Sequence, residues 1–439
     1  MKKFLLLNSP IFWDSAKENE QYLSPLGLGY IATYLDKSEI EVKIIDCVKE
    51  RLSVEHIVNL INKSNLDFWG MNIFTQNYDI VKHIFEKVKS DAEAFVGGQV
   101  AKNIYKDILS WDTDRKINII IGEGEFIIPE VALDRCLEKP IIIQGNKRVY
   151  KVDKNSMYYP DNISDIYIDR RFLNNEIVIN HYGEEEAAII TSRGCIYDCA
   201  FCGGAKSLNK DITIRKRTEE SVITEISEIT RIYPGVRSVR ILDDLFLRNV
   251  GSIETAKKIF EPFPTLSWRG MVHVLSLAKD LDKICELTQS RCKELFVGIE
   301  SGSNKIRKQI NKLGSVEDII NVSEKIMKNG IDLKGYFIYG FPNEDERDFK
   351  STFELAYRLK EISEKTTGIF RTSVFQFRPY HGTQLYNEIL SEGRIINSCT
   401  FNYSISQFEG RSQFNFDFGN YSLESDELLN DYIIKTQKL

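Results

Sequence analysis

The chain has 439 residues, 42% of them hydrophobic and 28% charged, which is the composition of a globular protein of about three domains. Its net charge of −6 and its lack of a basic tract argue against nucleic acid or an anionic membrane as a partner. No apolar run approaches the ~20 residues of a membrane span. Of the eight cysteines, the five outside one cluster are scattered, as in a reducing compartment, so we expect a cytoplasmic protein.

The first 145 residues alternate between strand and helix patterns, with Ser24 as the expected cap of the first helix. Such alternation predicts a doubly wound α/β domain over residues 1–145, in which helices cover both faces of a parallel sheet. Strands are predicted at residues 3–7, 42–45, 68–74, 94–96 and 117–121, and helices at 25–35, 54–61 and 78–88.

Small and acidic residues follow several of these strands. Ligands of a parallel α/β sheet lie beyond the carboxyl ends of its strands, where glycine lets a bulky molecule approach the main chain. The residues at these ends are Asp46, Gly97, Gly98, Gly122 and Gly124. Tight turns would explain the glycines equally well, so the pattern alone leaves a ligand site and a structural role open.

The segment 146–186 is predicted to be a linker that carries no chemistry. It begins within a predicted hairpin at residues 140–150 and continues as a polar, irregular stretch. We expect the charged groups Arg170–Arg171 and Glu184–Glu186 to be solvated.

Three cysteines, Cys195, Cys199 and Cys202, lie within eight residues, directly after a predicted strand at 187–190. Three thiolates on one loop can hold three irons of a cubic iron–sulfur cluster and leave the fourth iron open to a small ligand. A zinc site would need four ligands in clustered pairs, and no second pair is present. A disulfide would leave one thiol over and suits a secreted protein. The spacing therefore favours the cluster.

Strand and helix patterns alternate again over residues 187–392. With the strand before the cysteines they make six units, which predicts an open, partial (β/α)6 barrel of the TIM type. Further strands are predicted at residues 236–242, 265–271, 294–299, 333–338 and 370–377, and helices at 219–231, 280–289, 316–328 and 346–360.

Polar or glycine-rich groups end the predicted barrel strands, where the active groups of parallel barrels gather. Asp243 and Asp244 end the second strand, and like charges this close repel unless a cation joins them. A helix cap would explain these two acids without a ligand, and a salt bridge would explain Glu300 at the end of the fourth strand. His273 is expected to be structural.

Residues 393–439 are predicted to close the barrel mouth, with an edge strand around Phe414 and Phe416 and a helix at 425–436. This segment has no clustered cysteines, so a second iron–sulfur cluster is not expected. Cys399 could return a hydrogen atom to a substrate radical if it points inward, but an ordinary thiol is the simpler interpretation.

The cysteine spacing, with Phe201 before the last cysteine, resembles the cluster loop of the radical S-adenosylmethionine (SAM) superfamily. Residues 26–30, 96–99 and 122–125 resemble the subgroup in which the barrel follows a cobalamin-binding domain. The likeness extends from about residue 3 to about residue 390. One departure concerns cobalt. The motif Asp-x-His-x-x-Gly, which supplies a histidine ligand in some members, is replaced by Asp46-Cys-Val-Lys-Glu-Arg51.

The resemblance implies three cofactors: a [4Fe–4S] cluster, SAM on its open iron, and cobalamin at the strand ends of the first domain. It implies that the paired acids lie near the methionyl amino group of SAM and that a β-strand packs on the adenine. The residues implied for SAM are Phe201, Asp243, Asp244, Glu300, Ser301, Gly335, Ile338 and Gly340.

We therefore predict an enzyme that cleaves SAM reductively to a 5′-deoxyadenosyl radical and removes hydrogen from an unactivated carbon. The leading interpretation is cobalamin-dependent methyl transfer to a natural-product or peptide substrate, with flavodoxin or ferredoxin as electron donor. Two alternatives stay open. One is an epimerase or dehydratase that transfers no methyl group, and the other is a non-catalytic iron–sulfur electron carrier.

Overall fold

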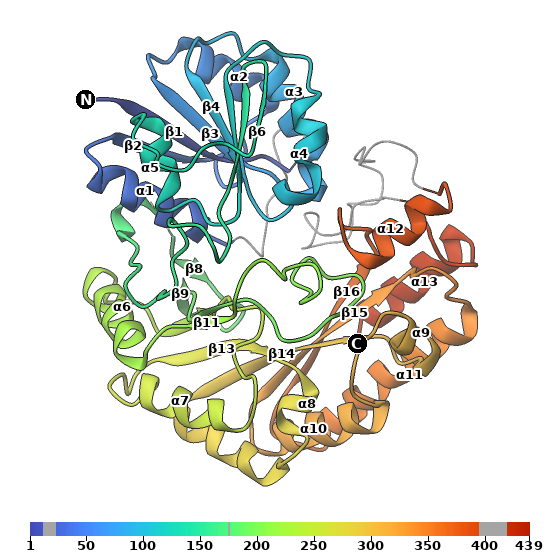
Figure 1. Cartoon of the computed structure of the whole chain (residues 1–439). Coiled ribbons are helices and arrows are strands. Elements are labelled where there is room, and N and C mark those ends of the chain that lie inside the picture. The colour runs from blue at the N-terminus through green and yellow to red at the C-terminus, as the bar shows by residue number, and fades with distance from the viewer. Residues whose placement is uncertain (12–22, 174–175, 395–418) are drawn as a thin grey trace. The chain divides into compact units, whose positions relative to one another are not determined.

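The computed structural model describes residues 1–11, 23–173, 176–394 and 419–439. Within these ranges the chain forms two compact units, each built on its own seven-stranded sheet (Figure 1). The first unit comprises Met1–Glu176, Lys210–Thr213 and Tyr380–Phe418, and the second comprises Ile177–Asn209, Ile214–Pro379 and Gly419–Leu439. No helix in the described ranges combines the length and the apolar character needed to cross a bilayer.

The sheet of the first unit has the strand order β2-β1-β3-β4-β5-β7-β6. All neighbouring pairs are parallel except β6 with β7, which form a hairpin. The strands are β1 (Lys3–Asn8), β2 (Glu41–Asp46), β3 (Phe68–Asn72), β4 (Glu93–Gly97), β5 (Ile117–Ile121), β6 (Ile142–Gln144) and β7 (Lys147–Lys151).

Helices cover both faces of this sheet because its strands are apolar on both sides. Leu5 and Leu7 of β1 belong to the core beneath α2 (Val54–Lys63), α3 (Tyr78–Lys87) and α4 (Ala101–Leu109). Phe4 and Leu6 face the opposite core, which is formed with α1 (Leu26–Lys37) and α5 (Ile127–Ala132). The prediction of a doubly wound parallel sheet is therefore confirmed.

Several local expectations for this unit were incomplete or wrong. Helices α4 and α5 were not predicted. Pro25, not Ser24, occupies the cap position of α1, and the Ser24 hydroxyl donates to the Glu176 carbonyl at 3.1 Å. The hairpin was correctly predicted, but β7 pairs with β5 and so extends the sheet. Arg170 is buried in an ion pair with Glu176 and is not a solvated charge.

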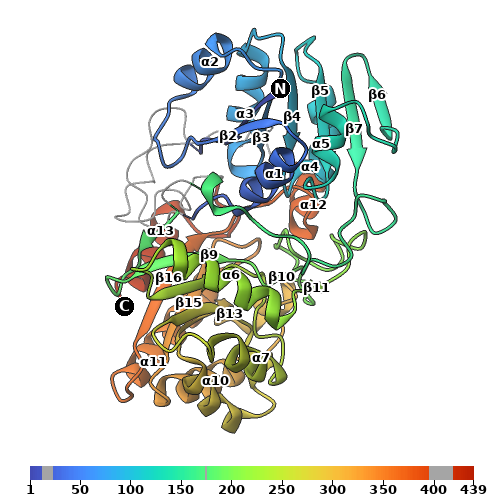
Figure 2. The same ribbon diagram turned by 90° about the vertical axis from the view of Figure 1, so that its left-hand side faces the viewer.

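The sheet of the second unit has the order β16-β15-β14-β13-β12-β9-β8 and is strongly curved (Figure 2). Its parallel strands are β9 (Glu185–Ile189), β12 (Ser238–Ile241), β13 (Ser267–Val272), β14 (Cys292–Glu300), β15 (Asp332–Tyr339) and β16 (Phe370–Gln376). The short β8 (Val178–Ile179) runs antiparallel to β9 at one edge. In the described residues β16 and β8 do not pair, so the barrel is open, as predicted.

Helices lie along the convex side of this sheet (Figure 1). Every second residue of each strand points toward these helices, and together these residues form one large core. Val239, Val297 and Phe337 are examples. The α-helices of this unit in the described residues are α6 (Glu219–Ile232), α7 (Gly251–Phe260), α8 (Val274–Leu277), α9 (Asn304–Gln309), α10 (Val316–Lys328), α11 (Glu346–Ser363) and α13 (Asp426–Gln437). Residues Leu281–Ser290, predicted as an α-helix, form a 3-10 helix instead.

The described part of the C-terminal tail joins the same outer layer. Leu429, Tyr432 and Ile433 of α13 belong to the core, and the Tyr339 hydroxyl lies 2.7 Å from the Thr436 hydroxyl. Helix α12 (Gln384–Ser391) follows β16 but belongs to the first unit. The expectations for Cys399, Phe414 and Phe416, and for closure of the barrel mouth by this segment, fall on residues outside the described ranges.

Candidate active site

The three clustered cysteines lie on the loop that follows β9. All three are free thiols, Cys199 buried and Cys195 and Cys202 half-buried. The loop is held by main-chain hydrogen bonds, including one from Ala200 to the Ile310 carbonyl at 2.9 Å. The Gly204 amide donates to Cys202 Sγ at 3.3 Å. Such amide-to-sulfur bonds are among the contacts that tune iron–sulfur clusters.

These thiols fit an iron–sulfur cluster by their chemistry. Burial raises the pKa of all three, to about 12 for Cys202, so thiolates there require a bound cation. In the described ranges, no group of three or more His, Cys, Asp or Glu side chains is arranged so that it could hold one metal ion. A cubane instead spreads its cysteine ligands over separate irons. The donor set therefore suits a cluster better than a mononuclear metal.

Asp243 anchors the cluster loop from the end of β12. Its buried carboxylate accepts hydrogen bonds from the Thr191 amide at 2.7 Å, the Thr191 hydroxyl at 2.6 Å and the Ser192 hydroxyl. The Arg248 guanidinium also binds the Ser192 hydroxyl, at 2.8 Å, and the Gly194 carbonyl at 3.1 Å. Asp243 therefore acts on the site by positioning the loop that carries the cysteines.

Asp244 is exposed, unlike its neighbour, although protein atoms surround its carboxylate closely. That desolvation raises the pKa of the Asp244 carboxyl, the charge of Asp243 raises it further, and Arg248 opposes them. A Cβ at Gly204 would lie 3.7 Å from the Asp244 carboxylate, which places this acid beside the turn of Cys202. A cationic ligand next to the cluster would relieve the repulsion between the two acids.

A buried ion pair ends β14 beside the cluster loop. The Lys312 ammonium lies 3.0 Å from Glu300 Oε1, and Glu300 has a left-handed backbone with φ of 64°. Burial disfavours the Lys312 charge, but Glu300 and Cys199 together raise its pKa. A Cβ at Gly298 would come within 2.4 Å of Glu300 Oε1 and 2.8 Å of Lys312 Nζ, so the absence of a side chain at Gly298 makes room for this ion pair. A left-handed backbone at a residue other than glycine, as at Glu300, is often found at functional sites.

Neither Lys312 nor its neighbour Arg307 was singled out from the sequence. Arg307 of α9 binds the carbonyls of Ile299 at 2.6 Å and Gly314 at 2.8 Å, which fixes the turn that brings Lys312 back to the sheet. Both lie in the helix and turn after Glu300, and their spacing in the sequence has no distinctive pattern. Only the fold shows that these cations face the cluster loop.

The residues expected to contact adenine divide between the two faces of the sheet. Ile338 lies half-buried on the inner face of β15, whereas Gly335 faces the outer core, where a Cβ would meet Ile299 and Phe370. Gly340 has φ of 92°, and its amide donates to Glu344 Oε2 at 2.6 Å.

Of the remaining residues expected to contact SAM, Phe201 lies at the site and Ser301 is turned into the fold. The Phe201 ring packs edge-on against Phe341 with 5.7 Å between ring centres, which joins the cluster loop to the end of β15. Ser301 is fully buried, and its hydroxyl lies 3.0 Å from that of Thr352.

His273 makes structural contacts through one ring nitrogen and its ring face, while its buried Nε2 has no hydrogen-bond partner in the described residues. Its Nδ1 accepts the Leu275 amide at 3.2 Å and so caps α8, and its ring stacks on Tyr197 of the cluster loop at 3.9 Å between centres. Burial lowers the pKa of His273 to about 3, so the imidazole is neutral.

The strand ends of the first unit carry glycines that the fold itself requires. A Cβ at Gly98 would lie 2.7 Å from the Ile73 carbonyl oxygen, and one at Gly122 only 2.1 Å from that of Val152. The constraint is weaker at Gly97, where a Cβ would lie 3.3 Å from the Ile120 carbonyl oxygen, and at Gly124, where it would lie 2.7 Å from the end of the Ile128 side chain. The positive φ and the close carbonyl contacts therefore account for Gly98 and Gly122, whereas Gly97 and Gly124 have no positive φ.

The same edge nevertheless suits a large planar ligand. Gly98 and Gly122 expose bare main chain, and at Gly27, in the first turn of α1, a Cβ would meet nothing within 4 Å. Asp46 caps the turn after β2 by accepting the amides of Val48 and Lys49, each at 3.1 Å. Cys47 is buried in the core, as expected for a small hydrophobic residue.

Comparisons with known proteins match both units. The family model described as "Radical SAM superfamily" matches residues 189–356, and the one described as "B12 binding domain" matches residues 16–132. An uncharacterized methyltransferase of Pyrococcus horikoshii is 27% identical over 85% of this chain and 80% of its own length. Cytidylyl-2-hydroxyethylphosphonate methyltransferase of Streptomyces wedmorensis is 23% identical over 84% of this chain and 78% of its own.

Two solved structures share the fold. The radical SAM methyltransferase TsrM of Kitasatospora setae, with tryptophan and a SAM analogue bound, has a TM-score of 0.66 at 15% identity. That match covers 91% of this chain and 78% of TsrM. The cobalamin-dependent SAM radical enzyme OxsB has a TM-score of 0.67 at 16% identity, covering 98% of this chain and 65% of OxsB.

Proposed function

We propose that this chain, which belongs to the radical SAM superfamily and carries an N-terminal B12-binding domain, transfers a methyl group to an unactivated carbon of a natural-product or peptide substrate. One observation carries the proposal: the same chain has a loop with three thiols at the mouth of a half-barrel and a B12-binding domain. A non-catalytic electron carrier has no use for the second of these parts.

When bound, the cluster, SAM and cobalamin supply one-electron reduction, an organic radical and a carrier for the methyl group. The chain's own residues hold and shield these groups. Cys195, Cys199 and Cys202 would ligate the cluster, and Asp244 would pair with the ammonium of SAM. The Phe201 and Phe341 rings, which pack on each other, would shield the side of the cluster loop that faces the end of β15.

Two further groups prepare the site before any ligand arrives. The carboxylate of Asp243 fixes the start of the cluster loop through Thr191 and Ser192, so the cysteines need little reorganisation to bind iron. Lys312 and Glu300 form a buried pair that can exchange partners with a zwitterionic ligand such as the methionyl part of SAM. The electron would come from a flavodoxin or ferredoxin.

The relatives support methyl transfer over the alternatives. The named activities of the Pyrococcus and Streptomyces proteins are both methyl transfers, and TsrM is a methyltransferase with cobalamin and a [4Fe–4S] cluster bound. Cys399, on which the epimerase alternative depends, lies outside the described residues.

Anaerobic purification with cobalamin supplied, followed by assay with SAM and dithionite, tests the proposal. We expect iron and cobalt in the protein, and both 5′-deoxyadenosine and S-adenosylhomocysteine as products. An epimerase or dehydratase would give 5′-deoxyadenosine without cobalt or S-adenosylhomocysteine. A carrier would release neither nucleoside, and either result would refute methyl transfer.

A further inference from the structure

The inner face of the half-barrel carries a partly exposed surface that no step above has used. Residues alternate along each strand, so those between the core positions point to the concave side. Arg240 of β12, Met271 of β13, and Tyr336 and Phe375 further along the sheet are all half-buried there, around the buried ring of Phe296. This face can therefore contact a molecule that enters the half-barrel.

Most charges on this face are already paired. The Arg269 guanidinium binds Glu186 at 2.7 Å and Glu294 at 2.9 Å, and Arg371 binds Glu294 at 3.0 Å. Both glutamates are at most 1% exposed, so their charges are fully engaged with these arginines. This network also shows that Glu186, expected to be solvated, is a buried partner of the inner face.

Arg240 is the exception. Its Nε is buried and has no hydrogen-bond partner, and no carboxylate in the described ranges forms an ion pair with its guanidinium. Its register partner on the parallel strand β13 is Arg269, which already takes both buried glutamates of this face, so neither is left to pair with Arg240. A guanidinium in this setting has unmet hydrogen-bonding capacity that an oxyanion would satisfy with a planar, two-pronged contact.

Aromatic rings extend from this arginine across the sheet. The Arg240 guanidinium lies 5.2 Å from the centre of the Phe296 ring, which Arg269 and Lys334 also approach, at 5.5 Å and 5.9 Å. Tyr336 packs against Phe296 at 6.2 Å and against Phe375 at 5.9 Å between ring centres. The face thus offers a cationic end and an apolar, aromatic remainder.

We propose that Arg240 binds an oxyanion of the substrate, a carboxylate or a phosphate, while Met271, Tyr336 and Phe375 contact its apolar part. The proposal rests on the proposed function, because it takes the inner face as the substrate site. Arg240 lies one residue before the end of β12 at Ile241 and three residues before Asp243, so at most about 10 Å of extended chain separates it from the residue that anchors the cluster loop. The substrate is therefore anionic at one end and long enough to reach from Arg240 to the cluster loop.

Binding of three small probes to the anaerobic holoenzyme with saturating SAM tests this proposal. Phenylacetate, phenyl phosphate and the neutral phenethyl alcohol share one ring and differ in charge, and calorimetry gives their dissociation constants. We expect at least one oxyanion to bind more tightly than the alcohol, and the preferred probe identifies carboxylate or phosphate as the natural group. Arg240→Gln should weaken that binding about tenfold or more, the effect of losing charge-assisted hydrogen bonds.

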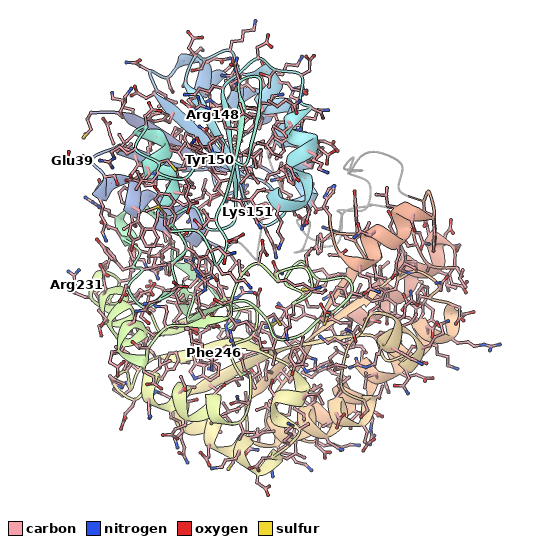
Figure 3. The ribbon with its side chains drawn as sticks, viewed as in Figure 1. Glu39, Arg148, Tyr150, Lys151, Arg231 and Phe246 are labelled. Carbon is pink, nitrogen blue, oxygen red and sulfur yellow. The ribbon has the colours of Figure 1, made fainter. Side chains whose placement is uncertain are left out.

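Two further variants make the test specific. Arg240→Lys keeps the charge without the planar fork and should weaken oxyanion binding less than Arg240→Gln. Arg231→Gln removes an exposed arginine of α6, labelled in Figure 3, and should leave all three constants unchanged.

Equal binding of alcohol and oxyanions, failure of both oxyanions to bind the wild type, or unaltered binding in Arg240→Gln would each overturn the assignment. Iron content and 5′-deoxyadenosine release without substrate should stay normal in Arg240→Gln. If the wild type itself contained no iron and released no 5′-deoxyadenosine, the proposed function would be refuted instead.

Discussion

Lys312 and Glu300 meet at the end of β14, with 3.0 Å between Nζ and Oε1 and less than a tenth of either side chain exposed. The glutamate adopts a left-handed backbone and the lysine returns from the turn after α9, so twelve residues of chain are folded to bring them together. A buried pair of this kind matters most when one partner is removed, because the other is then left as an uncompensated charge.

Replacement of the lysine should therefore destabilise the protein. We expect Lys312→Met to cost about 3–5 kcal/mol of the free energy of unfolding, as for other broken buried pairs. Scanning fluorimetry under anaerobic conditions would detect the lower Tm. Lys350→Met is the matched control, because this lysine pairs with Glu354 at 3.8 Å with more than 60% of each side chain exposed, and should be worth less than about 1 kcal/mol. Similar shifts in the two variants would contradict the importance of the buried pair.

Removal of any one cluster thiol should abolish iron binding. Cys195→Ala, Cys199→Ala and Cys202→Ala each leave two thiols, and we expect iron to fall from about four atoms per chain to nearly none. Release of 5′-deoxyadenosine should be lost with it. Cys285→Ala serves as control, since this exposed thiol donates to the Asp282 carbonyl far along the chain from the loop. A Cys199→Ala protein with normal iron and product release would refute the cluster assignment.

The two adjacent aspartates should respond differently to the same change. Asp243→Asn removes the negative charge to which three hydrogen-bond donors bind, so we expect a lower Tm and a lower iron content. Asp244→Asn should leave iron content unchanged and weaken SAM binding about tenfold, because it removes only an accessible carboxylate. Iron analysis and anaerobic calorimetry with SAM separate the two effects, and equal iron loss in both variants would contradict them.

Glu344 should make stability depend on pH. Burial raises its pKa from 4.5 to about 8, although the Gly340 and Phe341 amides oppose the shift. The folded state therefore retains a proton that the unfolded chain has released, and this stabilisation is complete below pH 4.5 and lost as pH rises through 8.

We expect the Tm of the wild type to fall between pH 6 and pH 8.5 (approximate ends of the titration window). Glu344→Gln should show a flatter profile. Glu346→Gln, an exposed neighbour, should behave as the wild type does. A steep profile that persists in Glu344→Gln would assign the pH dependence to other groups.

Much of the fold could be predicted because its signals are local. Alternating strand and helix patterns gave both parallel sheets and the open barrel, and the spacing of three cysteines identified the cluster loop within eight residues. Apolar periodicity and motif spacing are read over a few neighbouring residues, so they survive without knowledge of the fold.

The pairing of charges could not be predicted in the same way. Glu186 and Arg170 were expected in solvent and are buried, since partners 83 and 6 residues away in sequence neutralise them. Asp243 and Asp244 were treated alike, yet one is enclosed by the loop it anchors and the other stays accessible.

The sequence by itself determined the cluster loop, the order of the strands along the chain and the likeness to a known superfamily. Only the tertiary structure decided which side chains face inward, that Lys312 neutralises Glu300 and that Arg240 forms no ion pair with the residues that the structure describes. The physical reason is that burial and charge compensation are set by residues far apart in sequence, which meet only when the sheet curves and the helices pack against it.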